Sequence, residues 1–320
     1  MKSETLINKY VYGIVPSRRL GRSLGVSPIP FKTCNHSCIY CQLGRTTRMI
    51  NTRTNFFPHE EIIDEVRKYV QRVGEEAFDV VTIVGEGEPL LYKPIDKLIE
   101  KIKIITSKPL VVITNGTFLM EKEVREEISD SDVVMPTLDA WDEESYRRIN
   151  RPHKDLHYDD FYNGLVEFSH SFRGEVWLEV MIMKNINDSY SNIRRIGRRI
   201  KNIDPDRVYI NVPVRPPAEK YVDIPDKAEI DFAKDVFKAE SIEKIQKGDF
   251  SSLEEDALQG VIQIIKRHPM KESEIKQFVL SMKDENEFQK VLERLHKHNN
   301  VEIIEKNDQR FFRFKFEKED

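Results

Sequence analysis

FKTCNHSCIYCQLGRT, residues 31–46, contains every cysteine of this 320-residue chain, namely Cys34, Cys38 and Cys41. Three thiolates at the spacing C-x3-C-x2-C on one loop can bind one inorganic centre. A structural zinc site would need a fourth protein ligand, for which His36 is the nearest candidate, and a redox or incidental cluster is a further alternative. A [4Fe–4S] cluster on three cysteines would instead leave one iron open to a small molecule.

The composition is that of a globular protein with a heavily charged surface, with 39% hydrophobic and 33% charged residues. The sequence contains no run of eighteen apolar residues and no apolar segment at its start, so we expect neither a membrane span nor a secretory leader. Three clustered cysteines cannot form a disulfide framework, which favours a reducing compartment and a cytoplasmic location.

Charge is distributed unevenly along the chain. The formal net charge is −4, yet residues 1–60 contain nine Lys and Arg against two Glu, a local balance of +7. This basic segment is either an ordinary solvated face or a field that steers an anionic ligand toward the protein.

After the cysteines, strand patterns alternate with helix patterns. The spacing of apolar residues predicts six strands with helical crossovers, and this alternation is typical of a parallel α/β sheet, either open or curled into a barrel. The predicted strands are 24–30, 77–85, 109–116, 131–140, 174–184 and 206–214, and the helices between them include 94–106, 141–150, 159–172 and 188–203.

The last seventy residues have a different pattern. Three short amphipathic helices are followed by two strands joined at Asn307-Asp308, which predicts a winged helix-turn-helix module. We therefore predict a barrel at 1–225, a linker or helical connection at 226–251 and the winged helix at 252–320. Residues 251–320 hold 13 Lys and Arg against 15 Asp and Glu, which argues against sequence-specific DNA binding and favours docking of a substrate or partner, or a lid.

The motif C-x3-C-x-(aromatic)-C, with Tyr40 before Cys41, resembles the signature of the radical S-adenosylmethionine (SAM) enzymes. The resemblance implies that the cysteines hold a [4Fe–4S] cluster whose open iron binds SAM, and that one electron from a donor such as ferredoxin or flavodoxin cleaves SAM to a 5′-deoxyadenosyl radical. It covers roughly residues 10–215 and implies a partial (β/α)6 barrel whose lateral opening is closed by the substrate or by an extra domain.

Further segments that resemble this family follow the predicted strands. Gly85-Glu86-Gly87-Glu88-Pro89 resembles the family's G-G-E-P segment, in which Glu88 would bond the methionine amino group of SAM, although Glu86 replaces a glycine. Glu179 has the alternative role of a structural ion-pair partner. The residues expected to contact SAM are Tyr40, Gly85, Gly87, Glu88, Pro89, Thr114, Asn115, Thr137, Asp139, Glu179 and Asn211.

VPSRRLGRSLGV (15–26) and the N-x-P-x-R-P-P-A-E run that begins at Asn211 resemble an uncharacterised branch of the wyosine-synthetase-like subgroup with a C-terminal winged helix. Wyosine synthetases carry a second cluster on additional cysteines, and because this chain has none, wyosine synthesis is not expected. The arginines that could hold substrate phosphate or carboxylate, unless they bind SAM or form core ion pairs, are Arg18, Arg19, Arg22, Arg45, Arg48 and Arg215.

The favoured function is radical modification of a macromolecule, with RNA ahead of a peptide or protein because residues 1–60 are basic. A peptide or protein maturase, or an activating enzyme, is the alternative. A transcriptional regulator that uses the cluster as a redox sensor is a third hypothesis, which the segments around Glu88 and Asp139 do not support.

Overall fold

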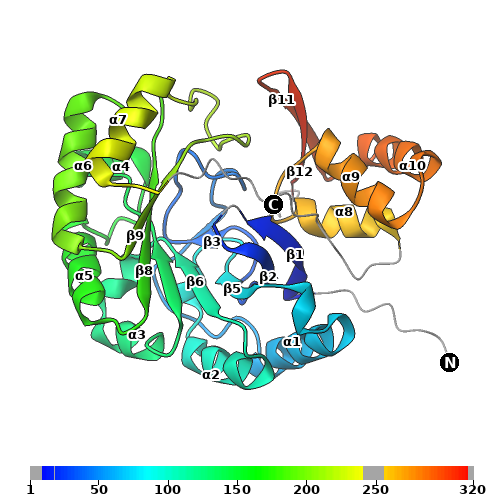
Figure 1. Cartoon of the computed structure of the whole chain (residues 1–320), viewed down its shortest axis with the longest axis horizontal. Helices are drawn as coiled ribbons and strands as arrows, with labels where there is room; N and C mark the ends of the chain where they lie inside the picture. Colours follow the sequence, from blue (N-terminus) through cyan, green and yellow to red (C-terminus); the bar gives the residue numbers. More distant parts are fainter. Residues whose placement is uncertain (1–8, 18, 241–255, 316–320) are drawn as a thin grey trace.

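The computed structural model describes residues 9–17, 19–240 and 256–315 (Figure 1). Seven strands form one sheet in the order β1-β2-β5-β6-β7-β8-β9, and every neighbouring pair except β1–β2 is parallel. The six parallel strands confirm the predicted parallel α/β sheet of a partial barrel. The strands are β1 (Val11–Ser17), β2 (Gly21–Val26), β5 (Val80–Val84), β6 (Leu110–Thr114), β7 (Val133–Pro136), β8 (Glu175–Met181) and β9 (Arg207–Asn211).

Helices cover the outer face of this curved sheet (Figure 1). They are α1 (His59–Val73), α2 (Ile95–Ile105), α3 (Lys122–Glu127), α4 (Glu143–Ile149), α5 (Tyr158–Ser171), α6 (Tyr190–Ile203) and α7 (Lys227–Phe237), with short 3-10 helices η1 (Glu75–Ala77), η2 (Pro89–Leu91) and η3 (Thr117–Met120). Their apolar faces and the outward side chains of the strands form the largest hydrophobic cluster of the described residues. The loops at the carboxyl ends of the strands are left free to build a site.

Two elements of the barrel were not predicted. Strand β1 pairs antiparallel with β2 and carries Gly13 and Pro16, which weaken a strand pattern. Helix α1 buries Ile62, Val66 and Val70 at helical spacing. Strand β2 ends at Val26, earlier than predicted, because the prolines of the following S-P-I-P segment lack the N–H that a ladder requires.

The β1–β2 turn enters the amino-terminal mouth of the barrel. Leu20 in this turn packs with Val111 of β6, Met135 of β7 and Tyr209 of β9, whose side chains face the barrel interior. The turn therefore closes the end of the barrel opposite the carboxyl ends of the strands.

The C-terminal module, residues 256–315, has its own hydrophobic core. Lys306 pairs with Gln309 across a two-residue turn in which Asn307 and Asp308 both have positive φ, as hairpin turns of this length require. The module contains α8 (Ala257–Ile265), α9 (Glu272–Met282) and α10 (Glu285–His296), and an antiparallel sheet in the order β10 (Met270–Lys271), β12 (Gln309–Phe314), β11 (Val301–Lys306). The predicted helices and hairpin are confirmed, whereas the winged-helix classification stays a prediction.

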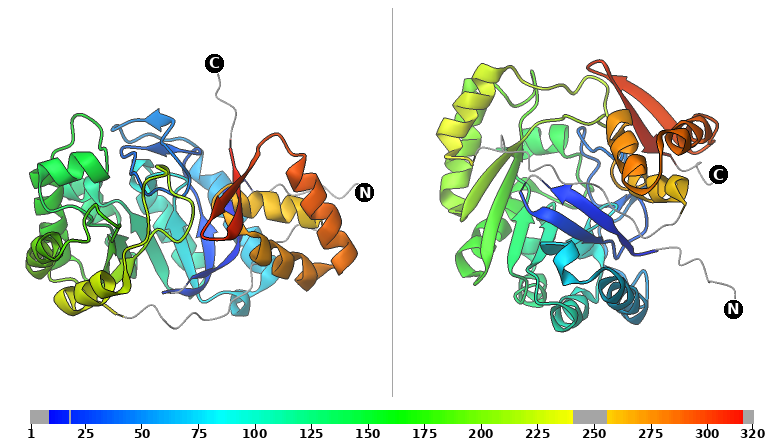
Figure 2. Two further views of the ribbon diagram at one scale, coloured as in Figure 1. Left: turned by 90° about the horizontal axis from the view of Figure 1, so that it is seen from above. Right: turned by 45° about the vertical axis from the view of Figure 1, so that its right-hand side comes forward.

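The module lies against the lateral opening of the barrel and contacts both of its edges (Figure 2). On the β1 side, Val15 packs on the module core. On the β9 side, the module's Lys306 Nζ donates to the Val222 carbonyl at 3.3 Å, and Glu274 pairs with Arg215 at 3.1 Å. The resemblance implied that either the substrate or an extra domain closes the lateral opening of the barrel. In this structure the C-terminal module, an extra domain, lies there.

The predicted domain boundaries stay predictions. Helix α7 packs on α6 and β9, and residues 241–251 of the predicted connection lie outside the described residues. Within the part of the chain that the structure describes, no helix is long and apolar enough to cross a membrane.

Candidate functional site

The three cysteines lie on the loop that follows β2, where each thiol is partly buried and none is in a disulfide. Amide N–H groups point at two of the sulfurs. The His36 backbone donates to Cys34 Sγ at 3.4 Å, and the side chains of Asn115 and Asn150 lie 3.9 Å from Cys34 Sγ and 3.6 Å from Cys38 Sγ. Burial raises the pKa of all three thiols, that of Cys38 to about 12.

These residues fit an iron–sulfur cluster. Among the described residues, no group of three or more His, Cys, Asp or Glu is arranged to hold a single metal ion. A [4Fe–4S] cluster makes a different demand, because each of its cysteines binds a separate iron. Three thiols on one loop, with amide donors that would stabilise thiolates, meet that demand.

The loop after β5 is pressed against the cysteine loop. A side chain at Gly87 would collide with the backbone carbonyl of Thr33, the residue before Cys34, so only glycine fits at this contact. The Glu86 carbonyl accepts from the Lys32 N–H at 2.6 Å, and the Glu88 N–H donates to the Thr33 carbonyl at 3.2 Å. This close approach explains the glycine of the Gly87-Glu88-Pro89 segment.

Glu88 is a buried carboxylate that is held by the end of β6. It accepts hydrogen bonds from the Thr114 hydroxyl at 2.6 Å, from the Asn115 N–H at 2.7 Å and from the Leu90 N–H at 2.9 Å. Burial raises the pKa of Glu88 to about 7, against the lowering effect of these hydrogen bonds. Thr114 and Asn115, which are both predicted site residues, therefore orient the carboxylate of a third predicted residue, Glu88.

The raised pKa of Glu88 makes the stability of the cofactor-free protein pH-dependent. Protonated Glu88 stabilises the fold below its ordinary pKa of 4.5, and this contribution is lost as the pH rises through about 7. We expect the Glu88 contribution to the free energy of unfolding to fall by roughly 3 kcal/mol over this range. Urea denaturation at pH 5 and pH 8 should show a smaller pH difference for Glu88→Gln than for wild type. Equal pH differences in wild type and Glu88→Gln would contradict the assignment.

Asp139, just after β7, connects the cysteine loop to β8. Its carboxylate accepts from the Tyr40 hydroxyl at 2.5 Å, from the Asn150 amide at 3.1 Å and from the Met181 N–H at 2.7 Å. Burial raises the pKa of Asp139 to about 6. Because Asn150 also contacts Cys38, the carboxylate and the cysteine share one donor.

Glu179 forms an ion pair with Arg19, which comes from the β1–β2 turn. Asn211 donates to the same carboxylate at 3.1 Å, and Thr137 forms an isolated bridge with Glu179. This ion pair inside the barrel agrees with the structural alternative for Glu179, and it brings four predicted residues together.

The other candidate arginines do not form one group. Arg18 lies outside the described residues. Arg22 pairs with Asp79 at 2.8 Å at the amino ends of β2 and β5, so its position does not agree with a substrate role beside the cysteines. Arg215 pairs with Glu274 of the module. Arg45 and Arg48 lie on the cysteine loop, where Arg48 stacks on Phe56 and Arg45 pairs with Glu219 at 2.8 Å.

Asn150 was missed as a residue of the site, and His36 was considered only as a zinc ligand. Asn150, which follows α4, contacts both Cys38 and Asp139. His36 is buried against the Tyr146 hydroxyl at 2.7 Å, and burial lowers its pKa to about 3, so that it is neutral. The only sequence signal for Asn150 was its place in the R-R-I-N-R-P segment after a helix that resembles the family.

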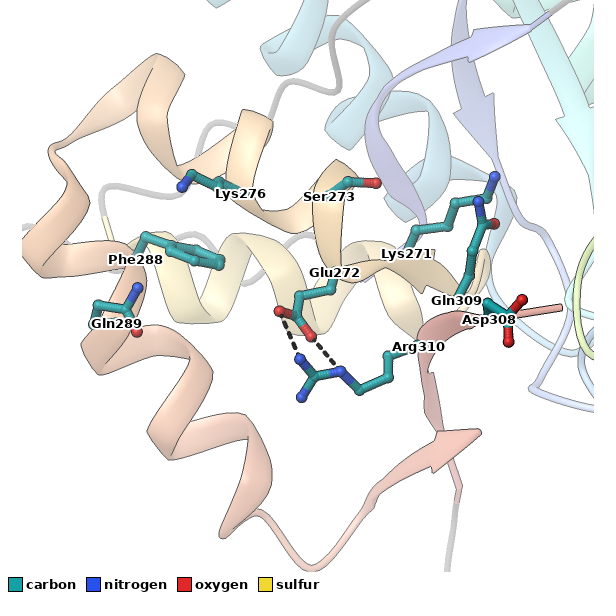
Figure 3. A pocket seen from close by; sticks show the side chains of 9 residues that line it. All are labelled: Lys271, Glu272, Ser273, Lys276, Phe288, Gln289, Asp308, Gln309 and Arg310. Atoms are coloured by element: carbon teal, nitrogen blue, oxygen red, sulfur yellow. Dashed lines mark hydrogen bonds and ion pairs between the residues drawn. The ribbon is translucent and has the colours of Figure 1, made fainter. Parts of the chain in front are cut away.

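A separate cavity of about 610 Å³ lies on the C-terminal module between α9, α10 and the start of β12 (Figure 3). An ion pair between Glu272 and Arg310, at 2.9 Å, lies within it. None of the predicted site residues lines this cavity, whose walls are Lys271, Glu272, Ser273, Lys276, Phe288, Gln289, Asp308, Gln309 and Arg310.

Comparison with known proteins gives the class. Residues 29–195 match the family model of the radical SAM superfamily, and the chain belongs to that superfamily. It is therefore a radical SAM enzyme, and its cofactors are a [4Fe–4S] cluster and SAM.

Several of its relatives are described by family alone. UPF0026 protein MJ1312 of Methanocaldococcus jannaschii is 34% identical over 275 residues, 84% of this chain and 85% of that protein. GTPase Obg of Brachyspira hyodysenteriae is 39% identical over 234 residues, 73% of this chain but only 34% of that protein. Among solved structures, Streptococcus suis SuiB bound to S-adenosylmethionine matches with a TM-score of 0.50 and 17% identity, covering 68% of this chain and 46% of SuiB. That likeness concerns the fold alone.

Proposed function

We propose that this enzyme modifies RNA, and that the substrate binds on the rim of the cysteine loop around Glu219. The Glu219 N–H donates to the Ile39 carbonyl at 3.0 Å, which fixes the loop after β9 on the cysteine loop. Two arginines share the Glu219 carboxylate, Arg45 at 2.8 Å and Arg151 at 2.5 Å, so the group has a net positive charge.

An exposed aromatic ring completes this rim. Tyr221 is 61% exposed, and its hydroxyl accepts from Arg151 at 3.3 Å. Arginines that contact phosphate beside an aromatic ring that stacks on a base are the usual elements of single-stranded RNA recognition. The Arg45 side chain is 69% exposed and is available for a phosphate. This arrangement next to the cysteines is the observation that carries the proposal.

The remaining roles follow from the site. When bound, the cluster and SAM supply radical chemistry that begins with one-electron cleavage of a carbon–sulfur bond. Cys34, Cys38 and Cys41 would hold the cluster, Glu88 would accept a hydrogen bond from the amino group of SAM, and Asp139 would orient Tyr40 beside the cofactor. The C-terminal module, which we propose to be a winged helix, covers the lateral opening and limits the entry of water.

The wyosine-synthetase-like branch remains our proposed subgroup, on the strength of residues 15–26 and the run from Asn211, and ferredoxin or flavodoxin is the proposed electron donor. The alternative substrate is a peptide or protein. The cavity on the module, which presents Lys276 and Arg310 beside Phe288, favours that alternative.

RNA binding is tested by fluorescence anisotropy with a labelled single-stranded RNA and the full chain. We expect Tyr221→Ala to weaken binding by about 5- to 150-fold, because one base–aromatic stack contributes roughly 1–3 kcal/mol. Tyr190→Ala is the matched control, since Tyr190 is 48% exposed at the start of α6, where its ring packs on Phe232 of α7.

The reconstituted enzyme, incubated anaerobically with SAM, dithionite and cellular RNA, should yield 5′-deoxyadenosine and a mass change in nucleosides of the RNA digest. Equal RNA affinity of wild type and Tyr221→Ala would contradict the binding site. A mass change in added peptides but not in RNA would support the alternative substrate.

A further inference from the structure

Two cationic side chains lie together at the cysteine loop and have no role in the site described so far. A side chain added at Gly44 would have its Cβ 3.1 Å from Lys32 Nζ and 3.9 Å from Arg313 Nη1. The Gly44 N–H donates to the Cys41 carbonyl at 3.0 Å. Both cations are therefore next to the turn that carries the third cysteine.

The two cations are poorly neutralised. Arg313 pairs with Glu302 at 2.8 Å, but its Nη1 is buried and has no hydrogen-bond partner among the described residues. Lys32 is partly buried and forms no ion pair with a carboxylate among the described residues. Like charges in such a place cost free energy unless an anion is close by.

The two residues come from different parts of the chain. Lys32 precedes Cys34 in a backbone conformation with a φ of 52°, which is unfavourable for lysine. Arg313 comes from β12 of the module, where Phe312 and Phe314 pack into the module core. Because side chains alternate along a strand, Arg313 points the other way, toward the barrel.

Docking of the module is what brings Arg313 to the cysteines. Arg267, just after α8, pairs with Glu86 at 3.0 Å, and both side chains are largely buried. Arg267 also stacks over the Tyr12 ring of β1 at 4.9 Å. These contacts attach the module beside the loop that presses on Thr33 and Cys34.

We propose that Lys32 and Arg313 are counter-charges of the iron–sulfur cluster, so that the docked module raises the reduction potential of the cluster. Reduction adds one electron and breaks no bond in the cluster, and a nearby cation stabilises the more negative form. The C-terminal module thus contributes to electron entry as well as covering the barrel.

The test is a potentiometric titration of the reconstituted full-length enzyme without substrate, followed by the electron paramagnetic resonance signal of the reduced cluster. We expect Arg313→Gln and Lys32→Gln each to lower the equilibrium ratio of reduced to oxidised cluster about tenfold, a shift of about −59 mV for a one-electron couple. Arg313→Lys, which keeps the charge, should stay near wild type.

The sign of the shift in reduction potential distinguishes an electrostatic role of Arg313 from a structural one. Glu302→Gln removes the carboxylate beside Arg313 and should raise the potential. Arg310→Gln is the matched control, because Arg310 lies on the same strand but pairs with Glu272 at the module cavity. The proposal is overturned if Arg313→Gln leaves the potential unchanged at full iron and sulfide content, or if Arg310→Gln shifts it equally. The measurement uses no RNA, so its result is independent of the proposed substrate.

Discussion

Replacing Cys38 by alanine is expected to abolish the visible absorbance of the iron–sulfur cluster and to reduce 5′-deoxyadenosine formation below detection. Cys38 is one of three thiols on a loop that can offer no replacement thiolate, because the chain contains no further cysteine. Two thiolates leave a second iron without a protein ligand, and the affinity of a metal centre is steeply sensitive to ligand number.

The matched control for this variant is Ser37→Ala. Ser37 is adjacent to Cys38, and its hydroxyl only accepts a hydrogen bond from the Thr46 N–H at 3.3 Å. We expect the control to keep its iron, sulfide and absorbance. A Cys38→Ala protein that retains four irons per chain and cleaves SAM would refute the assignment of the cluster ligands.

The second large effect is expected from Gly87→Ala. The added methyl group meets the Thr33 carbonyl, which is backbone and cannot rotate away, so the loop after β5 must move. We expect SAM affinity of the reconstituted enzyme to fall at least tenfold, because the movement displaces Glu88 from Thr114 and Asn115. The same overpacking should cost about 1–3 kcal/mol of stability.

Gly74→Ala separates the two consequences. Gly74 ends α1 with a φ of 79°, and no atom lies within 4 Å of an added Cβ. This control strains the backbone far from the site, so it should lower stability without weakening SAM binding. Thermal melting measures the stability, and isothermal titration calorimetry measures the SAM affinity. An unchanged SAM affinity in Gly87→Ala would show that the loop tolerates the collision.

The sequence was sufficient to predict the barrel because its parallel strands are buried on both faces and stand out as apolar runs. Glu88 and Asp139 were singled out by segments that resemble the family, and the structure buries both beside the cysteine loop, while their roles toward SAM stay predictions. Strand β1 was harder to predict, because its Gly13 and Pro16 interrupt the pattern and its partner β2 is what makes it a strand.

Long-range contacts were beyond the sequence. Asn150 reaches Cys38 across 112 positions, and Arg45 reaches Glu219 across 174. Arg22 is close to the cysteines in sequence, but strand β2 separates it from their loop and places it at the other end of the barrel. No local sequence pattern indicates that Arg45 lies on the cysteine loop while Arg22 lies at the opposite end of the barrel.

Glu86 has a consequence for how this architecture can be inherited. Its carboxylate is largely buried and is neutralised by Arg267 of the module, so the barrel and the module depend on each other at this position. A chimaera that exchanges the module between homologues must exchange positions 86 and 267 together, or leave an uncompensated charge at a buried seam. Homologues that have lost the module are expected to carry glycine or another small neutral residue at position 86. The residue at this position would then indicate whether a homologue has the module.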